Sequence, residues 1–139
     1  MTKLPVIVSA LLVAAPLAAA TPQSVHSQTA PRCSREFIVF FPAGSAQLAG
    51  GSQGVIDLAS KYAAGQPSSV RLTGYTDAAE GSDTGLSEAR AEIIRTSLVA
   101  SGVAAGKITV EGVGDRAPAV KTDRAEPLNR RVTICVLAD

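Results

Sequence analysis

Two charged residues, Asp77 and Arg90, lie on either side of a loop of small and polar residues in the segment LTGYTDAAEGSDTGLSEARAEIIR. The pattern places Asp77 at the exit of a predicted strand and Arg90 in the first turns of a predicted helix. An Asp can accept hydrogen bonds from an ammonium group, and the planar fork of an Arg matches a carboxylate. This spacing suits the binding of a zwitterion. The alternative is a surface Asp–Arg salt bridge that binds nothing.

Further polar residues could join this pair. Asn129 and Arg130 stand in the run NRR directly before the last predicted strand, where they would add polar and cationic groups at the same rim. Equally, this run could be a solvated strand entry in which Asn129 bonds the loop backbone. Asp83 stands at the start of the predicted helix, which either it or Thr84 can cap.

Other chemistries lack the residues that they need. A nucleophilic hydrolase requires a base near its nucleophile, yet the only histidine, His26, is in the N-terminal tail. Asp77, Glu80 and Asp83 are close in sequence, but their loop lacks the length and the terminal acid of a Ca²⁺-binding hand. We therefore expect solvated loop acids, no metal, no cofactor and no enzymatic activity.

The balance of charge argues against binding to nucleic acid. Without Lys3, 12 basic residues face 12 acidic ones, so electrostatic capture of nucleic acid or of an anionic membrane is not expected. Recognition should come from a local site instead.

The N-terminal residues have the pattern of a secretory signal peptide. Lys3 precedes the apolar run from Leu4 to Ala15, and a small-residue A-x-A site follows it. The sequence predicts a signal peptide at residues 1–20, a flexible linker at 21–35 and a folded domain at 36–139. An uncleaved membrane anchor is the alternative, although the run is short for a span of about 20 residues.

Export also bears on the two cysteines, Cys33 and Cys135. In an oxidising compartment a disulfide is the natural interpretation, and it would join the start of the domain to its last strand. Two separate buried thiols are the alternative.

The elements that position these residues alternate between strands and helices. Strands are predicted at 36–41, 69–76, 107–113 and 132–137, and a helix over 55–62. A second helix follows Asp83 and ends at Gly102, with one face made by Leu86, Ala89, Ile93, Ile94, Ser97 and Leu98. The order β-α-β-α-β-loop-β predicts a two-layer α+β fold, a mixed sheet with both helices on one face. The last strand is nearly apolar and should be internal to the sheet.

Several motifs, in this order, resemble the OmpA-like C-terminal domain of the OmpA/Pal/MotB family. They are GYTD at a strand end, LSEARA opening the helix, SGV at its close, the GVGD-R-A-P turn and NRRV before the last strand. The resemblance covers about Phe37 to Val136. It implies an OmpA-like fold and non-covalent binding of peptidoglycan at the meso-diaminopimelate of its stem peptide.

The resemblance also implies roles for single residues. Asp77 would receive the ammonium end of the diaminopimelate side chain, and Arg90 would receive its carboxylate. Leu86 would pack beside the methylenes. Arg130 would add a polar contact at the same rim, next to Asn129.

Two departures from the family's pattern concern the loops. The connection between GYTD and LSEARA is shorter than in many relatives, and Asp83 stands where Asn is frequent. An acid there would weaken a carboxylate contact or favour the amine. The loop Phe41–Ser45 lacks the Asp or Asn of many members, so its contacts would come from the backbone.

Resemblance and export signal together predict a periplasmic protein that contributes to envelope integrity, in association with the outer membrane or the cell wall. Outer-membrane or other envelope proteins are the candidate protein partners. Two alternatives stay open. One is an envelope interaction module with weak or lost wall binding, and the other is a membrane-anchored, MotB-like or outer-membrane assembly partner.

Overall fold

The computed structural model describes residues 31–138. The predicted signal peptide and most of the predicted linker lie outside the described residues. Within residues 31–138, no helix has the length and apolar character needed to span a membrane.

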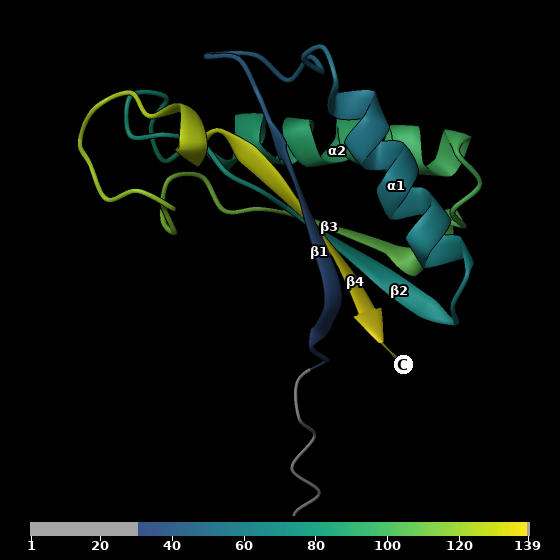
Figure 1. The fold of residues 1–139 in the computed structure, drawn as a ribbon. Coiled ribbons are helices and arrows are strands. Elements are labelled where there is room, and N and C mark those ends of the chain that lie inside the picture. Colours follow the sequence, from purple (N-terminus) through teal and green to yellow (C-terminus); the bar gives the residue numbers. More distant parts are fainter. Residues whose placement is uncertain (1–30, 139) are drawn as a thin grey trace, which may run out of the picture.

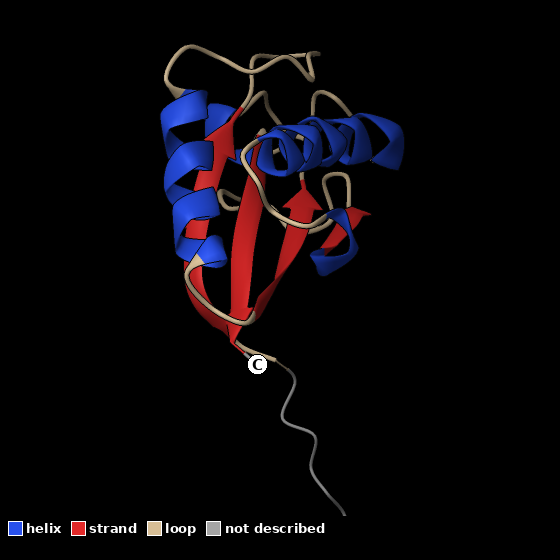
Figure 2. Ribbon diagram, turned by 90° about the vertical axis from the view of Figure 1, so that its right-hand side faces the viewer, coloured by secondary structure: helices blue, strands red, loops and turns tan. Residues whose placement is uncertain are grey.

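The described chain folds into one sheet with two helices. In order, the elements are β1 (Cys33–Phe40), α1 (Ser52–Ala64), β2 (Ser68–Gly74), α2 (Thr84–Ala100), the 3₁₀ turn η1 (Ala105–Lys107), β3 (Ile108–Gly112), the 3₁₀ turn η2 (Pro127–Asn129) and β4 (Arg131–Ala138). The strands lie in the order β1-β4-β2-β3, and both helices cover one face (Figures 1 and 2). Strand β4 is antiparallel to β1 and β2, whereas β2 and β3 are parallel. The predicted mixed α+β fold, with an internal last strand, is confirmed.

The core lies between the sheet and the helices. Val70 and Leu72 alternate with polar residues in β2 and are buried, and their register partners on β3 and β4 are also apolar. The helices contribute Ile56, Ala59, Ala63, Ala91, Ile94 and Leu98. Because strand side chains alternate between faces, the exposed Ile38 and Phe40 lie on the face that the helices leave uncovered.

The buried face of α2 differs from the predicted one. The structure buries Ile94 and Leu98 as expected, but it also buries Ser87, Arg90 and Ala91, whereas Ala89 is exposed and Ile93 is 39% exposed. The prediction followed the apolar residues, and it was wrong because two polar side chains find partners on the inner face.

Two glycines determine how closely α2 approaches the sheet. Gly74 and Gly112 are register partners at the ends of β2 and β3. A Cβ at Gly74 would overlap the carbonyl oxygen of Ser87, and one at Gly112 would lie 2.6 Å from the backbone nitrogen of Glu88. The first turns of α2 therefore rest directly on the strand backbones.

The folded region starts earlier than predicted. β1 begins at Cys33 rather than at residue 36, because residues 33–35 are fastened to β4. Cys33 forms the predicted disulfide with Cys135, and the Ser34 hydroxyl donates to the Val136 carbonyl oxygen at 2.9 Å.

Candidate functional site

Four segments that are far apart in sequence meet at one rim of the sheet. They are the loop after β1, the loop between β2 and α2, the first turns of α2, and the residues before β4. This rim brings Asp77, Arg90 and Arg130 together. A fourth charged residue, Glu80, joins them.

Asp77 is buried, with 1% of its surface exposed. Its Oδ2 accepts from Arg130 Nη1 at 2.9 Å and from the Glu126 N–H at 3.0 Å, and its Oδ1 accepts from the Glu80 N–H at 2.9 Å. Burial raises the pKa of the Asp77 carboxyl, but these hydrogen bonds to its charged form outweigh burial, so the pKa lies below its ordinary value.

Arg90 is fully buried and is held by main-chain oxygens. Its Nε donates to Ser45 at 2.8 Å, Nη1 to Tyr75 at 3.0 Å and Nη2 to Pro42 at 3.1 Å. The guanidinium carbon lies 5.5 Å from the centroid of the Phe41 ring. Three carbonyls thus fix the plane and direction of the guanidinium.

The remaining two N–H groups of Arg90 bind Glu80. Nη1 donates to Oε2 at 2.8 Å and Nη2 donates to Oε1 at 2.6 Å, which is the bidentate geometry of a strong ion pair. The Glu80 carboxylate also accepts from the Gly44 N–H at 2.8 Å and the Asp77 N–H at 3.1 Å. Burial raises the pKa of Glu80, but the hydrogen bonds, led by those from Arg90, outweigh it and lower the pKa.

These contacts correct two sequence-based expectations. Glu80 was predicted to be a solvated loop acid, yet its side chain is only 7% exposed because Arg90 draws it inward. The alternative of a surface salt bridge between Asp77 and Arg90 is also wrong. Asp77 pairs with Arg130 and Arg90 pairs with Glu80, and both pairs are largely buried.

The local sequence explains the position of Glu80. Asp77 accepts from the Glu80 N–H while Glu80 accepts from the Asp77 N–H, which is the reciprocal pattern of a capping box with Asp in the place of Ser or Thr. Gly81, at φ 83°, ends this single turn in the left-handed region. The pattern D-A-A-E-G is the sequence signal that would have identified Glu80.

The other predicted site residues differ in how they are exposed and in which groups they contact. Arg130, at 12% side-chain exposure, is the most exposed member of the two ion pairs, and its Nε donates to the Phe41 carbonyl at 3.2 Å. Leu86 is half-buried in the first turn of α2. Asp83 is the N-cap of α2 and accepts from the Gly85 N–H at 2.8 Å. Asn129 faces its own loop and exchanges two hydrogen bonds with Val120, at 2.9 and 2.8 Å.

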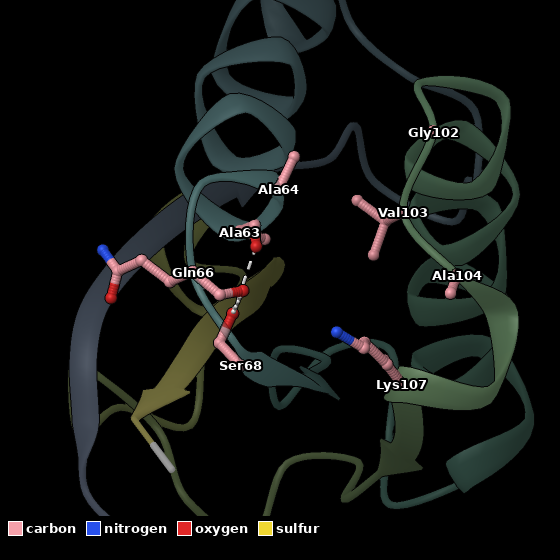
Figure 3. Close-up of a pocket in the computed structure, with 8 residues that line it drawn as sticks. All are labelled: Ala63, Ala64, Gln66, Ser68, Gly102, Val103, Ala104 and Lys107. Atoms are coloured by element: carbon pink, nitrogen blue, oxygen red, sulfur yellow. Dashed lines mark hydrogen bonds between the residues drawn. The ribbon is translucent and has the colours of Figure 1, made fainter.

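A cavity of about 190 Å³ lies at the opposite end of β2 (Figure 3). The end of α1 and the residues that follow α2 contribute to its wall, and the Lys107 side chain points toward it (Figure 3). The lining contains no carboxylate to accompany Lys107: Ala63, Ala64, Gln66, Ser68, Gly102, Val103, Ala104 and Lys107.

Metal binding finds no support at the rim. Within residues 31–138, no three His, Cys, Asp or Glu side chains come together as metal ligands. The acids at the rim pair with arginines instead, Glu80 with Arg90 and Asp77 with Arg130.

Comparison with known proteins shows which family the chain belongs to. An outer membrane protein of Gluconacetobacter diazotrophicus is 31% identical over 116 residues, which is 76% of this chain and 31% of that protein. This chain therefore spans about a third of that relative's length.

Solved structures share the fold. The peptidoglycan-associated lipoprotein from Burkholderia pseudomallei superposes with a TM-score of 0.66 at 22% identity, over 72% of this chain and 89% of that one. The C-terminal domain of Helicobacter pylori MotB gives 0.66 at 23% identity, over 76% and 85%. The cell wall anchor of the T6SS from Pseudomonas aeruginosa gives 0.62 at 30% identity, over 72% and 76%. A family model described as the OmpA family matches residues 40–131, and the chain belongs to this family.

Proposed function

We propose that this protein is a non-enzymatic binding protein of the bacterial cell envelope that holds peptidoglycan through the diaminopimelate of the stem peptide. The observation that carries the proposal is the placement of Asp77 and Arg90 at one rim, linked through Glu80. Membership of the OmpA family and the likeness to a protein described as a cell wall anchor support the same role.

The ligand's chemistry fits the two charges. The free end of the diaminopimelate side chain carries an ammonium and a carboxylate on one carbon. Asp77 would accept from the ammonium and the Arg90 fork would donate to the carboxylate. Three carbonyls already orient Arg90, so the Arg90 side chain would lose little conformational freedom when it binds the ligand. Leu86 would contact the methylenes, and Arg130 would keep Asp77 ionised.

Co-sedimentation of the full-length protein with purified sacculi tests the site. Asp77→Asn keeps the shape of the side chain but removes its charge, and Arg90→Lys keeps the charge but removes the fork. We expect each change to weaken binding about 10- to 100-fold, the range for a lost charge-assisted hydrogen bond.

Matched controls carry the same changes at exposed positions of the loop between β3 and η2. Asp123→Asn and Arg124→Lys alter exposed residues and should sediment like the wild type. Circular dichroism should confirm that all variants are folded. Equal sedimentation of all five proteins would refute the assignment of the site.

The identity of the ligand has its own test. Sacculi whose stem peptides carry lysine in place of diaminopimelate lack the second carboxylate. We expect the wild type to sediment with diaminopimelate sacculi and to be released from them by free meso-diaminopimelate. With lysine sacculi, the protein should stay in the supernatant. Equal binding to both walls would contradict the diaminopimelate assignment.

One observation favours a second candidate, an envelope interaction module with weak or lost wall binding. All five N–H groups of Arg90 already have acceptors within the protein. A folded wild type that stays in the supernatant at every sacculus concentration would support this module.

We also propose that residues 1–20 direct export to the periplasm and are then removed. Mass spectrometry of the protein isolated from cells should then find Thr21 as the first residue. A chain that still begins at Met1 would support the membrane-anchored assembly partner instead.

A further inference from the structure

We propose that Glu80 is an internal ligand that occupies the diaminopimelate site, so that the wall ligand binds only by replacing it. This inference rests on the proposed function and deepens it, because it assigns a residue that sets the affinity of the site. Three features of the rim carry it: the donors around the Glu80 carboxylate, a frame built without Glu80, and a second contact that Glu80 makes to Asp77.

Four donors converge on the Glu80 carboxylate. They are Nη1 and Nη2 of Arg90 and the N–H groups of Gly44 and Asp77, at 2.6 to 3.1 Å. Together they satisfy both oxygens of one carboxylate, in a site that is almost closed to water. Such a site fits any carboxylate that can reach it, and Glu80 is the one supplied by the chain.

The frame of this site does not depend on Glu80. The carbonyls of Pro42, Ser45 and Tyr75 hold Arg90 through the three N–H groups that do not bind Glu80. Gly44 adopts φ 63°, a left-handed conformation that glycine reaches without strain and that belongs to the loop after β1. Removing the Glu80 carboxylate would therefore leave an oriented fork rather than a collapsed one.

Glu80 also occupies the other half of the proposed site. Its backbone N–H donates to Asp77 Oδ1, the oxygen that neither Arg130 nor Glu126 contacts. One residue thus presents an N–H to Asp77 and a carboxylate to Arg90, which is the pattern that the zwitterionic end of diaminopimelate would present. Movement of the whole turn would free both halves, whereas loss of the Glu80 side chain alone would free the Arg90 half.

Glu80 is placed so that it can leave. It lies on a single turn between Asp77 and Gly81, and its neighbour Ala79 is exposed. No residue of this turn from Ala78 to Gly81 belongs to the hydrophobic core. When a binding-competent state is only a fraction of the population, the apparent affinity falls by that fraction.

Calorimetric titration of the full-length protein with meso-diaminopimelate tests the proposal. We expect Glu80→Ala to bind about 10- to 100-fold more tightly than the wild type, as it would if the site is vacant in about 1–10% of wild-type molecules. Glu88→Ala is the matched control, because it removes the same charge from an exposed position on α2. It should bind like the wild type.

A second measurement applies even if Glu80→Ala is less stable than the wild type. Acetate should refill the vacated site, so the melting temperature of Glu80→Ala should rise with acetate and not with chloride at the same ionic strength. The wild type and Glu88→Ala should not respond differently to the two salts. If Glu80→Ala does not fold, Glu80→Gln replaces it, and it should bind diaminopimelate more tightly than the wild type does.

The outcomes separate this inference from the proposed function. If the wild type sediments with sacculi through Asp77 but neither Glu80 variant binds more tightly, internal occupancy is wrong and wall binding stands. If a Glu80 variant takes up diaminopimelate or acetate while the wild type never sediments, internal occupancy stands and wall binding by the native protein fails. If no variant binds either ligand, both are overturned.

Discussion

At the scale of single residues, hydrogen bonds to two buried ion pairs determine the structure of the rim. Burying a charge is costly unless it is paired and fully hydrogen-bonded. Asp77 accepts three hydrogen bonds and Glu80 accepts four, so both carboxylates stay ionised at neutral pH. Two carbonyls of the loop after β1 accept from Arg90, so this loop holds the guanidinium without an Asp or Asn side chain.

The two carboxylates should make stability fall in acid. Their pKa values are lowered in the folded protein from ordinary values of 3.8 and 4.5, so each stabilises the fold fully above its ordinary value. That contribution is lost as the pH falls through the lowered value. We expect the free energy of unfolding, measured with urea, to decrease steadily from pH 5 toward pH 3.

The variant Glu80→Gln provides the control, because an amide does not titrate in this range. Its unfolding free energy should depend less on pH than that of the wild type over the same interval. Identical slopes for both proteins would show that Glu80 does not contribute to acid sensitivity.

The sequence identified only part of this chemistry. Asp77, Arg90 and Arg130 were recognised as candidates, because charged residues at the ends of predicted elements tend to meet at a rim. Burial of Arg90 could not be predicted, because three of its acceptors are main-chain oxygens that carry no sequence signal. The prediction of a solvated Glu80 is wrong because the turn from Asp77 to Glu80 forms a capping box that directs the carboxylate inward.

At the scale of elements, the docking of α2 on β2 and β3 places Arg90. The helix begins at Thr84 and is capped by Asp83, and its first turns lie against Gly74 and Gly112. This contact turns Ser87 and Arg90 inward. The Ser87 hydroxyl then accepts from the Gly114 N–H at 3.0 Å, which ties the end of β3 to the helix.

Replacing Gly74 by Ala should push α2 away from the sheet. The added methyl group would overlap the Ser87 carbonyl, and overpacking of this kind costs about 1–3 kcal/mol, occasionally more. We expect urea denaturation to show a loss of at least about 2 kcal/mol, together with weaker sedimentation with sacculi because Arg90 moves with the helix.

Gly106→Ala is the matched control for this change. A Cβ at Gly106 meets nothing within 4 Å, so this variant should keep the stability and wall binding of the wild type. Unchanged stability of Gly74→Ala would mean that the helix does not rest on the strand as described.

The sequence predicted the elements better than their faces. Within residues 31–138, alternating strand and helix patterns predicted the order and type of the four strands and two α-helices, but not the two 3₁₀ turns. The apolar last strand correctly indicated an internal position. The orientation of α2 was missed because a search for apolar faces selects Ile93, whereas the observed contact depends on two glycines in other elements.

At the scale of the whole molecule, the disulfide and the pairing of β1 with β4 join the N-terminal and C-terminal strands of the domain. Cys33 and Cys135 are separated by 102 positions, and β4 lies between β1 and β2. The bond therefore encloses nearly the whole described fold. The early start of β1 follows from this connection, since the residues around Cys33 lie beside Leu137.

Opening this bond should lower stability without changing recognition. The chain-entropy model assigns about 4–5 kcal/mol to a loop of this length, and measured gains are often smaller. We expect the double variant Cys33→Ser, Cys135→Ser to unfold at lower urea concentration, and a reductant to reproduce this shift in the wild type but not in the variant. The folded variant should still sediment with sacculi, because Cys33 lies at the opposite end of β1 from the rim and Cys135 lies in the middle of β4.

The polarity of β1 has a mechanical consequence. Cys33 and the rim lie at opposite ends of this strand, about 26 Å apart at 3.3 Å per residue, and the strand leads directly into the loop whose carbonyls hold Arg90. A pull between Cys33 and a wall fragment held at the rim runs along β1. It loads the antiparallel hydrogen bonds between β1 and β4 together, in shear, and the disulfide passes part of the pull to β4. Under the proposed wall binding, this geometry would distribute tension over the whole β1–β4 ladder.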